Sequence, residues 1–552
     1  RPHPLEVVLA AAAVPGRQAA AALGSLAANG LVDTDDRMAR VWPRHDLVRA
    51  ALTDRMLPTE VRRLHRELAG ALEAADAGPI LRLEHLFAAA DAAAEEAEAA
   101  AAEVILGPTL LAAPRDVTVL GRALVEVAGP TGGTASQVAT RLRIASAAFA
   151  IGDVAWAQHL LDLQQTALAE LDDPVLDALA LLTQSDVALP RDTAEHRWHE
   201  GERVLARLPP GPDHDDLYAR LLVWTGHAAM RCGNTDRSDQ LADLAAGQLE
   251  ESSPDLLRFE ITSLRVANAM AFTAPPGRID DHLSELDAIV DAAGDPVLRP
   301  MGALAHLERA MRTGTLDEVT AEVDQVTRLA TPGQRVEMRW WALATRAGLH
   351  LARGDLAAAS VAYLDAMAFG AGHGVALATG TALIHRFELD TSLGRLDTFH
   401  ALLPPPERDQ DDTLLVAQAL VREAAGDREG AIAAADLIAI EGRIATQGPG
   451  RWPVFAALAA RAAWLLGHRR LGEVVAAELA DRKEEGLNSI GLTYLGSLEH
   501  ARGLASVAAG RVDEGIDRLH TGLERETWFG SPIWIARAAR AAATAHERRA
   551  RT

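Results

Sequence analysis

Few side chains in this sequence of 552 residues have the types and spacing that catalysis or metal binding needs. His196 and His199 are three residues apart on one predicted helix and could share a metal ion. Position 203 is Arg rather than His, so the zinc-protease pattern is absent and a solvated helix face is the simpler interpretation. Residues 370–374 contain three glycines, as phosphate-binding loops do, but no strand precedes them, which favours a turn between helices.

The motifs of nucleotide hydrolysis and of serine hydrolases are also missing. The only lysine, Lys483, does not follow a glycine-rich loop, so the chain contains no P-loop, and it has no Gly-x-Ser-x-Gly motif. Carboxylates are too numerous for any pair to stand out, and Cys232, the single cysteine, cannot form an internal disulfide. We therefore expect a non-enzymatic protein of a reducing, cytoplasmic compartment, with no metal and no cofactor of its own.

Tryptophans that lie near arginines are better candidates for ligand recognition. Because aromatic residues make up only 4% of the chain, their clusters are informative. Such pairs suit a sugar, a polyketide-like molecule or a peptide, through stacking and forked hydrogen bonds. The alternative is that each tryptophan packs between helices. The candidate ligand- or partner-binding residues are Trp224 and Arg231; Arg339, Trp340 and Arg346; and Trp452, Arg461 and Trp464.

A recurring glycine predicts that stacked helical hairpins carry these residues. The glycine separates two helical runs and is followed by a polar residue that could cap the next helix. Its spacing is about 40 residues, or twice that, which resembles an elongated tetratricopeptide repeat of about 34 residues. A non-repetitive helical domain with chance glycines is the alternative. The glycines are Gly152, Gly233, Gly314, Gly354, Gly394, Gly426, Gly467 and Gly510.

The beginning of the chain shows another pattern. Helices are predicted over 5–13 and 17–28, then two short strands around an acidic turn at 33–36, then a helix from His45. This is the plan of a winged helix. The predicted fold class is therefore mainly α, a superhelical array of tetratricopeptide-like hairpins preceded by a small winged-helix domain. The predicted domains are a winged helix at 1–57, a helical linker with the first hairpins at 58–130, and the repeat superhelix at 131–552.

Charge and hydropathy exclude several partners. The net charge of -23 argues against nucleic-acid binding by the chain as a whole. Arginines of the winged helix could face phosphates, but Asp33, Asp35 and Asp36 in the turn would repel them, so no direct nucleic-acid contact is expected. No apolar stretch reaches about 18 residues, so no membrane span is expected. The Ala- and Glu-rich residues 88–104 are predicted to form a solvated helix.

Two neighbouring motifs resemble a known family. The sequence RHDLVRAAL at residues 44–52 is followed by RRLHRELA at residues 62–69. Together they resemble the segment just after the ATPase core in large ATP-binding LuxR-type transcription regulators of bacteria, the MalT-like members of the STAND class. In that family the first motif lies in a winged helix and the second begins a helical linker to a repeat sensor. Residues 522–538 resemble the last helices of such a sensor.

The resemblance implies a function that this chain cannot perform alone. It implies a signal-sensing region that binds an inducer or a partner protein in the repeat groove. That region would control an ATPase and a DNA-binding domain, both absent from this sequence, so ATP is expected only for the missing ATPase. Because the sequence starts with Arg1 and has no P-loop, we expect a portion of a longer protein that could oligomerise on activation. The alternative is a free-standing repeat scaffold for protein–protein interaction.

Overall fold

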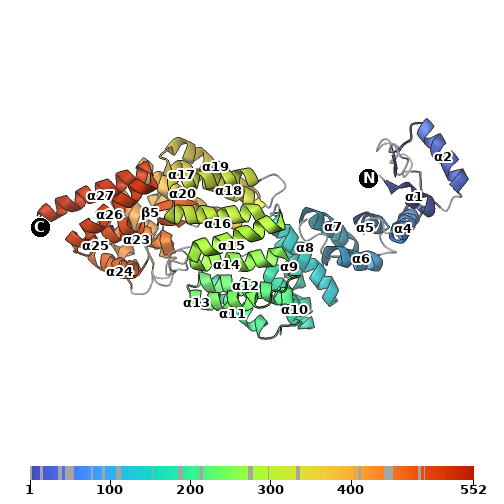
Figure 1. Cartoon of the computed structure of the whole chain (residues 1–552), viewed down its shortest axis with the longest axis horizontal. Coiled ribbons are helices and arrows are strands. Elements are labelled where there is room, and N and C mark those ends of the chain that lie inside the picture. Colours follow the sequence, from blue (N-terminus) through green and yellow to red (C-terminus); the bar gives the residue numbers. More distant parts are fainter. Residues whose placement is uncertain are drawn as a thin grey trace. The chain divides into compact units, whose positions relative to one another are not determined.

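The computed structural model describes the chain in two compact units, Arg1–Thr183 and Gln184–Thr552 (Figure 1). None of the helices in the described part is both long enough and apolar enough to cross a membrane. The described residues are 3–12, 16–34, 40–43, 55–75, 79–89, 94–106, 114–151, 153–183, 191–208, 210–211, 215–270, 278–295, 298–330, 336–402, 404–407, 412–440, 452–482, 486–489 and 491–551.

The first unit begins with two helices and a small antiparallel sheet whose strands are in the order β1-β3-β2. In that sheet Val32 lies opposite Pro43, and the unpredicted strand β1 pairs along the other edge of β3. The predicted helix from His45 and the motif at 44–52 lie outside the described residues, so the winged helix stays a prediction. The elements are β1 (His3–Pro4), α1 (Leu5–Ala11), α2 (Gly16–Ala28), β2 (Val32–Thr34) and β3 (Arg40–Pro43).

The rest of the first unit consists of helices in which each packs on the next. Residues 94–104 are helical as predicted, but the prediction that residues 88–104 are solvated was wrong, because Ala97 and Ala101 of α6 are fully buried and Val104 is 8% exposed. The predicted boundaries at 57 and 130 both fall inside this unit. The helices are α4 (Pro58–Ala74), α5 (Pro79–Ala88), α6 (Ala94–Leu106), α7 (Pro114–Ala128), α8 (Ala135–Ala150), α9 (Val154–Leu171) and α10 (Pro174–Thr183).

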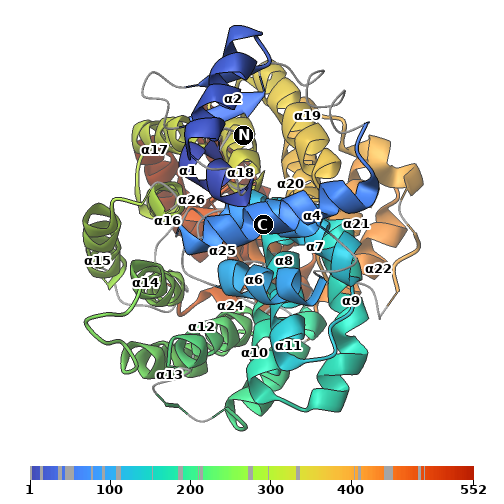
Figure 2. The ribbon, with the colours of Figure 1, turned by 90° about the vertical axis from the view of Figure 1, so that its right-hand side faces the viewer.

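The second unit is an array of stacked helical hairpins, which confirms the mainly α fold class. Each helix packs on the next, and alternate helices also touch, for example α12 on α14 and α14 on α16 (Figure 2). The first elements are α11 (Arg191–Leu205), α12 (Asp215–Arg231), α13 (Thr235–Ala246), α14 (Asp255–Ala269), α15 (Arg278–Ala293), α16 (Leu298–Thr313), α17 (Leu316–Leu329), α18 (Val336–Ala352), α19 (Leu356–Gly372) and α20 (Ala376–Leu393).

The remaining elements of this unit include one β-hairpin that the sequence did not predict. They are the 3-10 helix η2 (Leu396–Leu402), α21 (Asp412–Ala424), α22 (Arg428–Ile438), α23 (Trp452–Leu466), α24 (Arg469–Leu479), β4 (Gly486–Ser489), β5 (Thr493–Ser497), α25 (Leu498–Ala508), α26 (Val512–Phe529) and α27 (Pro532–Arg551).

The recurring glycines separate helices as predicted. Six of them have a positive φ, from +63° at Gly467 to +89° at Gly510, the left-handed region that glycine adopts without strain. The side chain of Asp355 then accepts a hydrogen bond from the backbone N–H of Ala358 at 3.0 Å, which caps the following helix. Gly314 lacks a positive φ, and Gly152 lies outside the described residues.

The β-hairpin is enclosed by helices from different parts of the second unit. β4 packs on α16 and α23, and β5 packs on α18, α23, α25 and α26 (Figure 1). All residues of both strands are buried. The last two helices also reach back, because the Ser531 hydroxyl donates to the carbonyl of Ala352 at 2.6 Å and Arg525 donates to the carbonyl of Arg312 at 3.0 Å. The end of the chain thus packs on helices about halfway along it.

Candidate functional site

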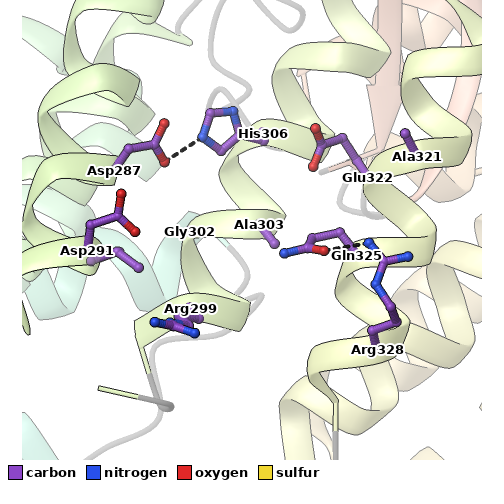
Figure 3. A pocket seen from close by; sticks show the side chains of 11 residues that line it. Asp287, Asp291, Arg299, Gly302, Ala303, His306, Ala321, Glu322, Gln325 and Arg328 are labelled. Atoms are coloured by element: carbon purple, nitrogen blue, oxygen red, sulfur yellow. Dashed lines mark hydrogen bonds and ion pairs between the residues drawn. The ribbon is translucent and has the colours of Figure 1, made fainter. Parts of the chain in front are cut away.

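A polar pocket of about 570 Å³ lies between three successive helices of the array, α15, α16 and α17. Helical spacing explains its lining, because residues three or four apart share a helix face. Each of the three helices therefore contributes one short stripe of side chains (Figure 3). The lining residues are Asp287, Val290 and Asp291 of α15; Arg299, Gly302, Ala303 and His306 of α16; and Ala321, Glu322, Gln325 and Arg328 of α17.

Opposite charges are separated within the pocket. Figure 3 shows Asp287, His306 and Glu322 toward one end and Arg299 toward the other, with Asp291 and the Arg328 guanidinium between them. The Asp287 carboxylate contacts His306 Nε2 at 2.8 Å. Arg328 donates to the side-chain oxygen of Gln325 at 2.6 Å. The pocket therefore has an acidic end and a basic end.

Glu322 is the most electrostatically perturbed group of the pocket. Burial raises the pKa of its carboxyl group, and the nearby Asp287 and Glu318 raise it further, whereas His306 and Arg309 lower it. Within the described part of the chain, the side chains of Glu322, Asp291 and Arg299 form no ion pair. These groups are therefore available to a charged ligand.

The lining of the pocket consists mainly of charged and small side chains. It contains no nucleophile held by a base, and the described residues include no group of three or more His, Cys, Asp or Glu side chains that could hold a metal ion. Its volume is typical of a small-molecule site. These residues were not predicted from the sequence, because charges at helical spacing look like a solvated face. The signal in the sequence is Gly302 followed by Ala303, two small residues that α16 contributes to the lining of the pocket.

The predicted tryptophans lie in the packed interior. Trp340 and Trp452 are 2% exposed, Trp224 is 4% exposed and Trp464 is 9% exposed. They belong to α12, α18 and α23, and the structure does not bring them into a common pocket. This burial favours the packing interpretation, and their role in ligand binding stays a prediction.

The predicted arginines have varied surroundings. Arg461 is half-buried and paired with Glu388. Arg339 lies over the ring of Phe369, 5.0 Å from its centroid. Arg346 is exposed and Arg231 is half-buried.

Arginine does pair with tryptophan in this fold, but with other partners than predicted. The Cζ atom of Arg548, in α27, lies 4.1 Å from the ring centroid of Trp464 in α23. The Cζ atom of Arg482, which follows α24, lies 4.4 Å from the ring centroid of Trp452, also in α23. Such cation–π contacts stabilise helix packing by about 0.5–2 kcal/mol each.

The remaining sequence candidates lie in ordinary surroundings. His196 is exposed, with its Nε2 3.6 Å from Glu200, and His199 is likewise exposed, 3.9 Å from Glu195. Residues 370–374 comprise the last residues of α19 and the start of the turn to α20, where Gly374 has a φ of +65°. Cys232 is half-buried.

A second concentration of titratable groups lies in the packed interior around the β-hairpin. The Glu388 carboxylate pairs with Arg461 and with Arg537, the latter at 2.7 Å. Burial raises the pKa of Glu388, but the two arginines outweigh burial and hold it below its usual value. Burial lowers the pKa of the neighbouring His500 to about 3. Because the Glu388 carboxylate is neutralised by two arginines from other helices, we interpret this cluster as structural.

Comparisons with known proteins add little to these observations. No protein-family model matches the sequence, and no curated protein does. One similar solved structure is a signal transduction ATPase with numerous domains, with a tetratricopeptide repeat sensor, from Pyrococcus horikoshii. It is 11% identical with a TM-score of 0.25, and the match covers 96% of this chain and 61% of that ATPase.

A second structure is a circular tandem repeat protein, 12% identical with a TM-score of 0.13, where the match covers 99% of this chain and 97% of the other. Both TM-scores are too low to indicate a shared arrangement of the whole chain. The contacts between successive helices define the class of the protein. It is a mainly α protein built of stacked tetratricopeptide-like hairpins.

Proposed function

We propose that this chain is the signal-sensing region of an ATP-dependent bacterial transcription activator. It binds an inducer or a regulatory protein in its helical array and controls an ATPase and a DNA-binding domain that lie outside this sequence. The observation that carries the proposal is the charged pocket on α15–α17, which has the size of a small-molecule site. The family resemblance at residues 44–52 and 62–69 supports the regulatory context.

A sensor works by binding its ligand more tightly in one arrangement of the protein than in another. The three helices that line the pocket belong to two neighbouring hairpins, so a ligand held by all three would stabilise one stacking of α15 on α16 and α17. Because each repeat packs on its neighbours, a change in the stacking of these helices could pass along the array to neighbouring domains.

The reading frame that encodes this chain provides the first test. We expect it to encode a P-loop upstream of Arg1 and a helix-turn-helix domain downstream of Thr552. The second test measures ATP hydrolysis of that longer protein with and without a cell extract, for the native protein and for Arg328→Ala. Stimulation that the variant loses would support the proposal. A reading frame limited to these residues would overturn it.

One observation favours a second candidate, the free-standing scaffold. Helix α19 has a single charged residue, Asp365, and it exposes an apolar stripe that includes Val361 (62% exposed) and Leu364 (56% exposed). Exposed apolar stripes of this kind mark interaction surfaces. Two sets of variants distinguish the scaffold from the sensor. Val361→Ser with Leu364→Ser should weaken partner binding by a scaffold, whereas Arg328→Ala should weaken ligand binding by a small-molecule sensor.

A further inference from the structure

We propose that the α15–α17 pocket binds a small zwitterion, a free amino acid or a short peptide. Its ammonium group would lie at the acidic end and its carboxylate between Arg299 and Arg328. This assignment rests on the proposed sensor function and names the class of its ligand.

The acidic end has more negative charge than its own neighbours neutralise. Asp287 has His306 as its partner at 2.8 Å, but Asp291 and Glu322 have no ion pair within the described part of the chain. Glu322 is half-buried, and the carboxylate of a half-buried residue gains most from a cation that comes with the ligand. An ammonium group provides that cation and three hydrogen-bond donors.

The basic end is complementary to a carboxylate. Arg299 comes from α16 and Arg328 from α17, and Figure 3 shows Arg299 at the end away from His306 and the Arg328 guanidinium beside Gln325. No carboxylate in the described ranges pairs with either of them, although neighbouring Arg309 pairs with Asp280 at 3.2 Å and Glu318 at 3.4 Å. Guanidinium groups bind carboxylates through forked hydrogen bonds. Two such groups from different helices would hold one carboxylate in a fixed orientation.

The middle of the pocket leaves room for a short backbone. Gly302 and Ala303 line it from α16 and Ala321 lines it from α17, so none of these positions fills the space between the charged ends. The three carboxylates argue against phosphates and polyanions, and the charged lining argues against apolar ligands. A molecule with a positive and a negative group separated by a short chain matches this order of charges.

Isothermal titration calorimetry of the full chain tests the assignment. The probes are the free amino acids and an equimolar library of free dipeptides, each compared with its N-acetylated form and its C-amidated form. We expect one or more free zwitterions to bind, and both blocked forms to bind at least about tenfold more weakly, since each loses charge-assisted hydrogen bonds.

Variants of the pocket locate the site. Arg299→Ala with Arg328→Ala should weaken binding of the free zwitterion at least about tenfold, and Glu322→Gln should weaken it as well. The matched control is Arg470→Ala, because Arg470 is an exposed arginine of α24 with no ion pair in the described part of the chain. The thermal midpoint of each variant shows whether it is folded.

Three results would overturn the assignment. They are equal binding of a blocked form, the absence of binding by every free zwitterion, and unchanged binding by the double arginine variant. If the assignment failed while the longer protein still responded to a cell extract, the sensor function would stand and only its ligand class would be wrong.

Discussion

At Gly348, helix α18 lies in close contact with the turn of the β-hairpin. A methyl group built on Gly348 would overlap the backbone carbonyl oxygen of Leu492, which lies in the turn of the β-hairpin. It would also come within 3.2 Å of the His385 ring. The absence of a side chain at this residue therefore allows the hairpin to reach α18.

Gly348→Ala should destabilise the second unit by about 3 kcal/mol, because the backbone of a buried turn cannot move away as a flexible side chain can. Urea denaturation followed by circular dichroism measures this loss. Gly302→Ala is the control: its new Cβ would lie 3.5 Å from Val290, an ordinary contact, and alanine favours helix. That control should be neutral or stabilising by up to about 1 kcal/mol, and equal losses in both variants would contradict the explanation.

Glu526 is a buried acid whose protonation is linked to stability. Its carboxylate accepts hydrogen bonds from the backbone N–H of Ser497 at 2.5 Å and from the Tyr494 hydroxyl at 3.0 Å. Burial nevertheless dominates and raises its pKa from 4.5 to about 7. Since the folded state holds this proton more tightly, the stabilisation is complete below pH 4.5 and is lost as pH rises through 7.

Glu526→Gln should remove this pH dependence, because glutamine keeps the shape of a protonated acid. A shift of this size corresponds to about 3 kcal/mol at most, at 1.36 kcal/mol per pKa unit. We expect the variant to be more stable than the native chain at pH 8 and of similar stability near pH 5. The measurement is the urea midpoint from pH 5 to pH 9, and parallel curves for the two proteins would refute the assignment.

At the scale of elements, one buried carboxylate joins three helices. Glu388 of α20 contacts Arg461 of α23 and Arg537 of α27, and Arg537 also donates to Ser392 at 2.9 Å. The Glu388 side chain is only 2% exposed. Removing it would leave two half-buried arginines without this counter-charge.

Glu388→Ala should therefore cost about 3–5 kcal/mol, the usual penalty for breaking a buried ion pair from one side. The free energy of unfolding from chemical denaturation gives the answer. Glu473→Ala is the comparison, because Glu473 pairs with Arg469 on an exposed helix face at 3.0 Å, and such a pair contributes at most about 1 kcal/mol. A loss at Glu388 no larger than that at Glu473 would rule out a structural role for the cluster.

At the scale of the whole molecule, the second unit is held together by contacts far apart in sequence. α27 contacts α18 and α25, and Trp534 packs against Tyr494 of the hairpin with ring centroids 5.9 Å apart. Gly496 allows this approach, because a Cβ there would lie 2.6 Å from the Trp534 ring. The last helix therefore supports helices that precede it by about 200 residues.

A chain that ends at residue 530 should lose this support. We expect faster hydrogen exchange in α18 and α20, measured by mass spectrometry on peptides, because their partners Ser531, Trp534 and Arg537 are removed. Helices α4 to α8 of the first unit form their own core and should exchange as before. Unchanged exchange in α18 would show that α27 does not stabilise it.

Local signals in the sequence were sufficient for the helices and their ends. The spaced glycines, each followed by a polar residue, identified most of the hairpin turns, since glycine conformation and helix capping act within a few residues. The error at 88–104 arose because alanine suits both an exposed helix and a closely packed one. Only neighbouring helices decide between these, and α6 packs on α5, α7 and α8.

The candidate pocket could not be predicted from local sequence patterns. Trp340 and Trp452 were predicted as ligand contacts because aromatic residues are scarce, but burial depends on which helix faces which. The residues of the pocket belong to three helices, and each helix alone has only an ordinary charged stripe.

The sequence by itself determined the helical class, the hairpin turns and the absence of a P-loop, because these depend on residue type and short spacing. Tertiary structure alone decided that a β-hairpin lies among α16, α18 and α23, that the last helices pack on the middle of the chain, and that α15–α17 enclose a charged pocket. Such features depend on long-range packing, where the free energy comes from burying surfaces that are distant in sequence.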